Sequence, residues 1–200
     1  MNAGATAGRV YDSLRHLIVN HGFRPGDRLD ATYLAEKLAS SVTPVRDALN
    51  MLTGEGLVET RKAGGFFLPS LDEPALQDMY MWEAQILRLA LKTGHLEPVE
   101  VPAMRPKASY ADRLDAVMLG IAATSHNVEH ARALRRLGAR LHAVRTLEMD
   151  VIDGAWGDLA HLEYAREIAD AAALRKLLQH YHHRCILASA RLVRAVYRAR

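Results

Sequence analysis

The chain has 200 residues, of which half are hydrophobic and 24% charged, and its formal net charge is +3. This length can bury the core of one or two domains, and the weak positive charge is compatible with nucleic acid without indicating it. A single cysteine, Cys185, excludes an internal disulfide, and no run of about 18 apolar residues predicts a membrane span. Because the first residues also lack an apolar signal segment, we expect a soluble, cytoplasmic protein without a membrane partner.

The first predicted elements are short helices. Apolar residues at helical spacing between Val10 and Ile18 predict a helix that ends before His21. Pro25-Gly26 predicts a turn, and Arg28-Leu29 could then form a very short strand. A second short helix is expected around Leu34-Ala35.

A third helix and a hairpin follow. Thr43 is suited to cap this helix with Pro44 at its first position, and apolar residues at helical spacing over 45–52 predict its buried face. Residues 57–68, LVETRKAGGFFL, are typical of two short strands joined by the Gly64-Gly65 turn. Three helices closed by a hairpin predict a winged helix-turn-helix over residues 1–70.

The remainder, 71–200, is predicted to be all-helical, so the fold class is mainly α. It starts with an amphipathic helix after Asp72, continues through a proline-containing loop over 94–110, and then carries three helical runs: Asp112–Ala123, Val128–Met149 and Trp156–Arg198, the last broken near Asp170. We expect this second domain to bind a ligand and to dimerise.

Several residues of the first domain are suited to double-stranded DNA. Hydroxyls at the start of the third helix can bind phosphate oxygens, and Arg46, one turn further on, can reach a guanine or a phosphate. Basic residues beside the glycine turn suit a wing that lies on the DNA backbone. The predicted DNA-binding residues are Ser41, Thr43, Arg46, Arg61, Lys62, Gly64 and Gly65. Each residue alone is also compatible with a helix cap or a solvated hairpin, but their joint order favours DNA binding.

Residues 10–68 resemble the winged-helix domain of GntR-type bacterial transcription regulators. The shared motifs are Pro25-Gly26, Leu34-Ala35, Thr43-Pro44-Val45-Arg46-Asp47-Ala48-Leu49, Glu55-Gly56-Leu57-Val58 and Gly64-Gly65. Val42 stands where that family usually has an arginine. A valine offers no charged contact but can meet a thymine methyl, so we expect an operator preference that differs from the family's norm.

Residues 75–195 resemble the all-helical effector domain of the FadR-like (FCD) branch, most clearly in TSHNVEHARALRRLGARLHAVRTLEM. The resemblance implies a homodimer that senses a small metabolite, a carboxylate held by a divalent metal such as Zn on one Asp and three His. Counting back from Asn127, the expected Asp and His positions hold Leu114 and Met118, with Asp115 one place away. An arginine usual in the first helix of that domain corresponds to Glu83.

Two interpretations of the effector site remain open. His161, His180 and His183 could together hold a metal ion, because three imidazoles suffice for Zn. Alternatively, the metal is lost and the pocket uses arginines such as Arg88, Arg140 or Arg145, each of which could equally be a solvated helix residue.

Three classes of function are compatible with these features. The leading one is a sequence-specific transcription regulator, a repressor, and not an enzyme. The second is an architectural or partner-docking DNA-binding protein without an effector. The third, a metal-dependent enzyme that uses the histidines with Asp158 or Asp170, is disfavoured because the chain shows no nucleophile motif and no phosphate-binding loop.

Overall fold

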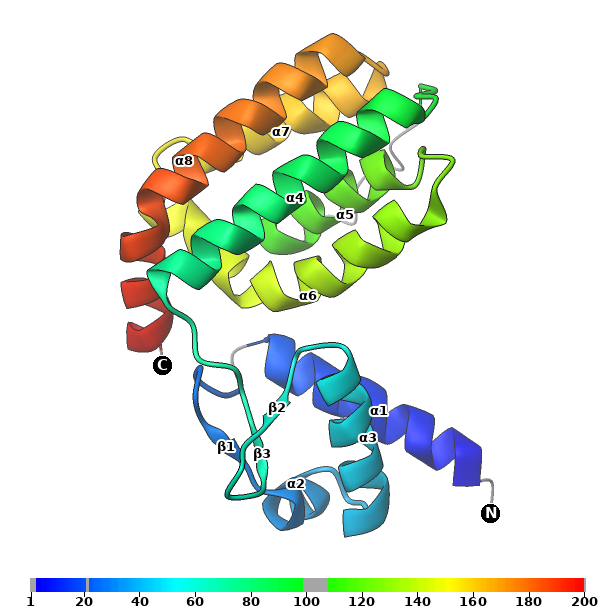
Figure 1. Cartoon of the computed structure of the whole chain (residues 1–200), viewed down its shortest axis with the longest axis vertical. Helices are drawn as coiled ribbons and strands as arrows, with labels where there is room; N and C mark the ends of the chain where they lie inside the picture. Colours follow the sequence, from blue (N-terminus) through cyan, green and yellow to red (C-terminus); the bar gives the residue numbers. More distant parts are fainter. Residues whose placement is uncertain (1–2, 21, 99–107, 200) are drawn as a thin grey trace. The chain divides into compact units, whose positions relative to one another are not determined.

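The computed structural model describes residues 3–20, 22–98 and 108–199. Contacts group these residues into two units (Figure 1). The first unit runs to Leu71 and includes the end of the last helix from Tyr197, and the second spans Asp72–Val196.

The first unit contains three helices and a small sheet. Its elements are α1 (Ala3–Val19), β1 (Arg28–Leu29), α2 (Ala31–Lys37), α3 (Val42–Gly54), β2 (Glu59–Thr60) and β3 (Phe66–Phe67). The strands are antiparallel in the order β1-β3-β2, with Arg28 and Glu59 both opposite Phe67. The predicted winged helix-turn-helix is therefore confirmed, and the very short strand at Arg28 closes its sheet.

The core of the first unit lies between α1 and α3. Val10 and Leu14 of α1 and Leu49 and Leu52 of α3 are fully buried, as their helical spacing predicts. At the end of α3, the Tyr11 hydroxyl donates a 2.5 Å hydrogen bond to Glu55. Burial and this carboxylate raise the pKa of Tyr11 to about 12.

The turn between α2 and α3 differs from the prediction in one detail. Helix α3 begins at Val42 with Ser41 as its N-cap residue, two positions before the predicted cap at Thr43. Ala39, within the turn, has φ +47°, a left-handed conformation that is costly for a residue with a Cβ. Asp30 caps α2 by accepting hydrogen bonds from the amides of Thr32 and Tyr33.

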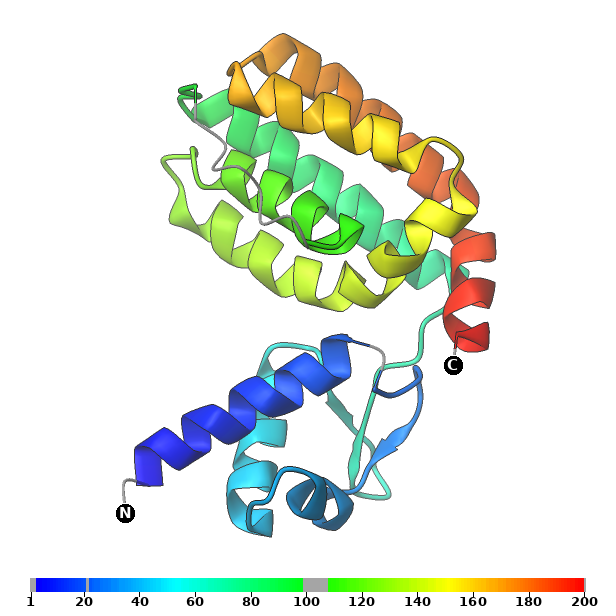
Figure 2. The same cartoon turned by 180° about the vertical axis from the view of Figure 1, so that it is seen from behind.

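The second unit is all-helical, and Figures 1 and 2 show its helices from opposite sides. They are α4 (Glu73–Thr93), α5 (Tyr110–Ala122), α6 (Val128–Val151), α7 (Ala155–Glu167) and α8 (Ala171–Arg198). Helices α4, α5 and α6 pack on one another, and α7 packs on α5 and α6. No helix in the described part of the chain is long and apolar enough to cross a membrane.

The predicted break near Asp170 is confirmed. Helix α7 ends at Glu167, Ala169 is left-handed, and Asp170 accepts the amides of Ala172 and Ala173 at the start of α8. Most of the predicted proline-containing loop, at 99–107, lies outside the described residues.

Candidate functional site

One face of α3 carries polar side chains that are suited to contact DNA. Thr43, Arg46 and Asn50 are exposed, while the opposite face is buried in the core. Their spacing of three and four residues places them in one row. The Ser41 side chain makes no capping hydrogen bond to α3, so its hydroxyl is not used within the helix.

Asn50 was not among the residues selected from the sequence. It lies one turn beyond Arg46 on the same exposed row, and an Asn amide can bind adenine with two hydrogen bonds. The acidic neighbour of Arg46, Asp47, is also exposed and can accept a hydrogen bond from cytosine. The helical spacing from Arg46 was the signal that could have found Asn50.

The N-cap residue of α2, Asp30, interacts electrostatically with this row. The pKa of the Asp30 carboxyl is lowered, first by the Tyr33 amide and then by the Thr32 amide and the charges of Arg28 and Arg46. The Arg46 charge therefore interacts weakly with Asp30, the N-cap residue of α2.

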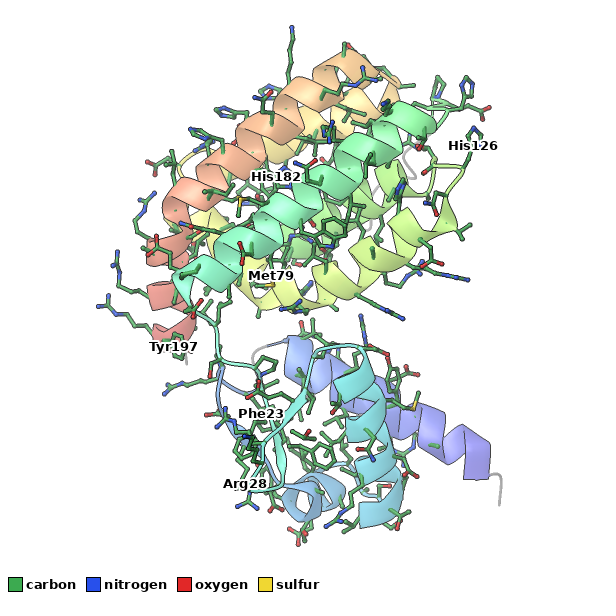
Figure 3. All side chains as sticks on the ribbon, viewed as in Figure 1. Phe23, Arg28, Met79, His126, His182 and Tyr197 are labelled. Carbon is green, nitrogen blue, oxygen red and sulfur yellow. The ribbon has the colours of Figure 1, made fainter. Side chains whose placement is uncertain are left out.

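The wing turn is formed by two consecutive glycines. Gly64 and Gly65 have φ +83° and +93°, which residues with a Cβ rarely adopt, and the Gly64 amide donates to the Arg61 carbonyl at 2.8 Å. A side chain at Gly65 would also lie 3.6 Å from Arg28 Nε. Arg28, labelled in Figure 3, thus adds an exposed cation near the turn that the sequence did not single out.

Arg61 and Lys62 differ in how the wing holds them. The Arg61 guanidinium lies 4.1 Å from the centre of the Phe67 ring, and its Nε donates to Glu59 at 3.0 Å. Lys62 is exposed in the turn. Arg61 is thus oriented by its own sheet, which would reduce the entropy lost if it binds a phosphate.

The second unit has a polar centre formed mainly by charged residues. Arg145 of α6 is 1% exposed, and its Nη2 contacts both oxygens of Glu83 of α4 at 2.5 and 2.6 Å. Its Nη1 donates to Asp115 of α5. Burial opposes ionisation of Glu83, but Arg145 and His182 outweigh it and lower the pKa of this carboxyl to about 2.

Two histidines extend this network. His182 of α8, labelled in Figure 3, has its Nε2 3.3 Å from Glu83 and its Nδ1 2.7 Å from the Leu178 carbonyl. Both ring nitrogens thus lie within hydrogen-bonding distance of oxygen atoms. His142 of α6 places Nδ1 2.9 Å from Asp115.

Glu148, one turn beyond Arg145, is held by three tyrosines. Tyr80 donates to it at 2.7 Å, and Tyr110 and Tyr181 donate at 3.1 Å. Burial raises the pKa of Glu148, although the Arg145 charge and the three hydroxyls oppose the shift. The centre therefore joins α4, α5, α6 and α8 through hydrogen bonds.

The three histidines predicted to hold a metal do not come together. His161, His180 and His183 are exposed, and no group of three His, Cys, Asp or Glu residues that could hold a metal ion occurs among the described residues. The inward histidine of α8 is His182. Successive residues of a helix are rotated by about 100° about its axis, so His180 and His183 point in other directions and are exposed. The metal centre predicted from these three histidines is thus not formed in this arrangement.

The three predicted effector arginines also differ in their exposure. Arg88 is exposed and donates to Gln85 on its own helix, and Arg140 is exposed as well. Only Arg145 reaches the centre of the unit. Leu114 and Met118 are buried apolar residues, whereas Asp115, one place from the expected position, accepts a hydrogen bond from Arg145.

Sequence reasoning missed most of this centre, which includes Glu83, Asp115, His142, Glu148 and His182. One available signal was Gly138, an isolated glycine in the middle of α6. A Cβ there would lie 3.3 Å from Asp115 Oδ1 and 3.6 Å from Arg145 Nη1. The glycine leaves room for the carboxylate and the guanidinium to meet beside the helix.

The exposed row of α3 and the glycine-turned wing define the first unit as a winged helix-turn-helix domain of the DNA-binding class. Residues 6–68 match the family described as bacterial regulatory proteins, gntR family. The first unit is thus similar to this family over its helix-turn-helix and wing.

Three relatives illustrate this similarity. The Nta operon transcriptional regulator of Aminobacter aminovorans is 40% identical over 76 residues, which are 38% of this chain and 36% of that protein. The transcriptional repressor GlaR of Escherichia coli is 31% identical over 88 residues, 42% of this chain and 40% of that protein. The matched stretches thus span well under half of these relatives.

The third relative, the E. coli regulator McbR, matches across both units. It is 24% identical over 180 residues, 87% of this chain and 78% of that protein. Its solved structure has a TM-score of 0.64 with 21% identity, and the match covers 96% of this chain and 99% of that one. The predicted fold, with an all-helical second part, is confirmed. All three relatives are named as regulators of transcription, not as enzymes, as predicted.

Proposed function

We propose that the protein is a cytoplasmic, homodimeric repressor that binds a double-stranded DNA operator and releases it in response to a small carboxylate. The observation that carries the DNA-binding part is the exposed row of Thr43, Arg46 and Asn50 on α3. In a helix-turn-helix, the start of the second helix reads base edges in the major groove. The name of the repressor GlaR, which resembles the first unit, supports repression.

The predicted contacts divide into two kinds. We assign base contacts to the exposed Arg46 and Asn50, and phosphate contacts to the exposed Ser41, Thr43, Arg61 and Lys62. Gly64 and Gly65 would allow the wing to approach the DNA backbone. Base contacts determine sequence preference, and phosphate contacts determine the dependence on salt.

Selection of bound DNA from a random pool tests this assignment and identifies the operator. Arg46→Ala should then reduce operator affinity by about 1–3 kcal/mol and relax preference at one or two base positions. Lys62→Ala should weaken binding to all sequences alike and reduce the salt slope by about 1. Arg132→Ala is the matched control, because it removes an exposed positive charge from α6 of the second unit. Equal affinity in the wild type and Arg46→Ala would contradict the proposed interface.

The homodimer is proposed because two recognition helices related by a two-fold axis can bind two half-sites about one or more DNA turns apart. Helix α4 offers a surface for it, since Trp82 and Leu89 are exposed seven residues apart on one face. Light scattering at micromolar concentration should give twice the mass of the chain. Trp82→Glu combined with Leu89→Glu should shift it to the single-chain mass, while Leu187→Glu on α8 serves as the control. A wild type with the single-chain mass that still binds its operator tightly would contradict the dimer.

The effector site is proposed to be metal-free and to use Arg145. Arg145 is the only Lys or Arg that is buried in the described part of the chain, so it is the one cation there that water does not screen. Elemental analysis of protein purified without chelator and without a His tag tests the absence of metal. Near-stoichiometric metal that is lost in His161→Ala would restore the metal interpretation.

A DNA-binding protein without any effector is a second candidate. It is favoured by the fact that Glu83 already binds Arg145 with both oxygens. Thermal unfolding against a panel of small metabolites separates the two candidates, because a ligand that binds only the folded state raises the melting temperature.

A further inference from the structure

Glu83 occupies the position on Arg145 that an external carboxylate would need. Both Glu83 oxygens lie within 2.5–2.6 Å of Nη2, and the Glu83 side chain is 0% exposed. A charge-assisted contact of this kind is among the strong hydrogen bonds of proteins. An anion can therefore bind Arg145 from this side only if Glu83 moves away.

The same contact also fixes α4 on α6. Glu83 bonds to Arg145, and Tyr80, one turn earlier on α4, bonds to Glu148, one turn later on α6. These two buried connections join the helices at adjacent turns. Helix α4 follows directly in the chain after the DNA-binding unit, which ends at Leu71. A change in how α4 is held thus acts on the helix that is covalently joined to that unit.

The surroundings of Arg145, which is itself 1% exposed, are more exposed on the Asp115 side than on the Glu83 side. Its Asp115 partner is 21% exposed and the His142 side chain 10% exposed, whereas Glu83 is fully buried. Gly138 carries no side chain beside Asp115 and Nη1. Arg145 Nε is buried and has no hydrogen-bond partner in the described structure, so one donor remains for an incoming acceptor.

We propose that Glu83 is an internal competitor for Arg145, and that a small carboxylate acts by displacing it and so releasing α4 from α6. This inference rests on the proposed function, in which the second unit senses a carboxylate. The exchange replaces one carboxylate on the guanidinium with another, and Glu83 retains His182 as a partner.

Sodium acetate is the probe that tests this inference. Glu83→Ala removes the CH2–COO⁻ group beyond Cβ, and acetate supplies the same atoms. Both tryptophans, Trp82 and Trp156, belong to the second unit, so their fluorescence follows its thermal unfolding. Glu83→Ala should melt at a lower temperature than the wild type and recover in acetate, but not in sodium chloride of equal ionic strength.

The acetate concentration that gives half of the maximal rise in melting temperature should also be at least about tenfold lower in Glu83→Ala than in the wild type. Glu163→Ala is the matched control, since it truncates a Glu–Arg pair with Arg113 in the same unit. Arg113 is 30% exposed and already solvated, so acetate should not rescue this variant beyond chloride.

The double variant Glu83→Ala/Arg145→Met covers the case in which Glu83→Ala does not fold. It has no unpaired guanidinium, so it should fold and show no response to acetate. If Glu83→Ala stays unfolded in acetate while the double variant folds, or if folded Glu83→Ala responds no more to acetate than to chloride, the competitor role is overturned. These readouts use no DNA and stay interpretable if the operator proposal fails.

The regulatory part is tested with the selected operator. The operator affinity of Glu83→Ala should differ from that of the wild type already in acetate-free buffer, because α4 is released from Arg145 in this variant, whereas Glu163→Ala should bind the operator as the wild type does. An operator affinity of Glu83→Ala equal to that of the wild type, with the melting temperature rescued by acetate, would overturn the transmission through α4 and leave the proposed DNA-binding function intact.

Discussion

The Glu83–Arg145 pair makes a quantitative prediction about the stability of the second unit. Glu83→Gln keeps the size of the side chain but removes its charge, so Arg145 loses one of its two carboxylate partners. A pKa that falls from the ordinary 4.5 to about 2 on folding corresponds to about 3 kcal/mol of stability. Breaking a buried ion pair by removing one partner typically costs 3–5 kcal/mol, which agrees with this magnitude.

The pH dependence of the effect follows from the direction of the shift. Because the pKa of Glu83 is lower in the folded than in the unfolded chain, its stabilisation is complete above pH 4.5 and is lost as the pH falls towards about 2. The pKa of Glu148 is raised, so its contribution has the opposite sign and weakens as the pH rises through its folded value. Glu148 is present in both proteins, so most of its effect cancels in their difference.

Urea unfolding followed by tryptophan fluorescence measures this difference in the second unit. At pH 7 the Glu83→Gln variant should be less stable than the wild type by about 3 kcal/mol, and the gap should narrow below pH 4.5. Glu163→Gln, in the partly exposed pair with Arg113, should cost less than about 1 kcal/mol. If the two variants lose equal stability, or if the gap for Glu83→Gln is the same at pH 3 and pH 7, the reasoning about the buried pair is refuted.

Three further variants test other features. Ala39→Gly should stabilise the first unit by about 1 kcal/mol, because glycine adopts the observed φ of +47° without strain. The gain should appear as slower amide hydrogen exchange in α3, and an unchanged exchange rate would contradict the prediction. A Gly→Ala change inside a helix normally raises the free energy of unfolding by about 1 kcal/mol. Gly138→Ala should lack this gain because its Cβ crowds Asp115, whereas Gly157→Ala, with nothing within 4 Å, should show it. Urea unfolding measures both variants, and equal gains would count against the crowding. His161→Ala should change neither metal content nor melting temperature, as expected for an exposed residue outside any metal site.

The first unit could be predicted almost completely from the sequence. Its elements are short, its apolar residues recur at regular spacing, and its turns are marked by Pro25-Gly26 and Gly64-Gly65. The small errors, such as the cap at Ser41 rather than Thr43, lie at helix ends, where local signals differ by only one or two residues. The DNA-binding residues remain predictions, but their exposure on α3 and in the wing is consistent with the pattern that selected them.

The second unit shows what only the tertiary structure decides. The sequence determined its helices and their breaks, because helical periodicity and caps are local properties. It did not determine that Arg145, rather than Arg88 or Arg140, is buried. Nor did it determine that His182, rather than His180 or His183, faces Glu83. Whether a polar helical residue lies in the core depends on the rotation of each helix about its axis and on partners from other helices. Glu83, Asp115 and Arg145 are stable in the core only together, since each charge needs the others there to offset the cost of leaving water.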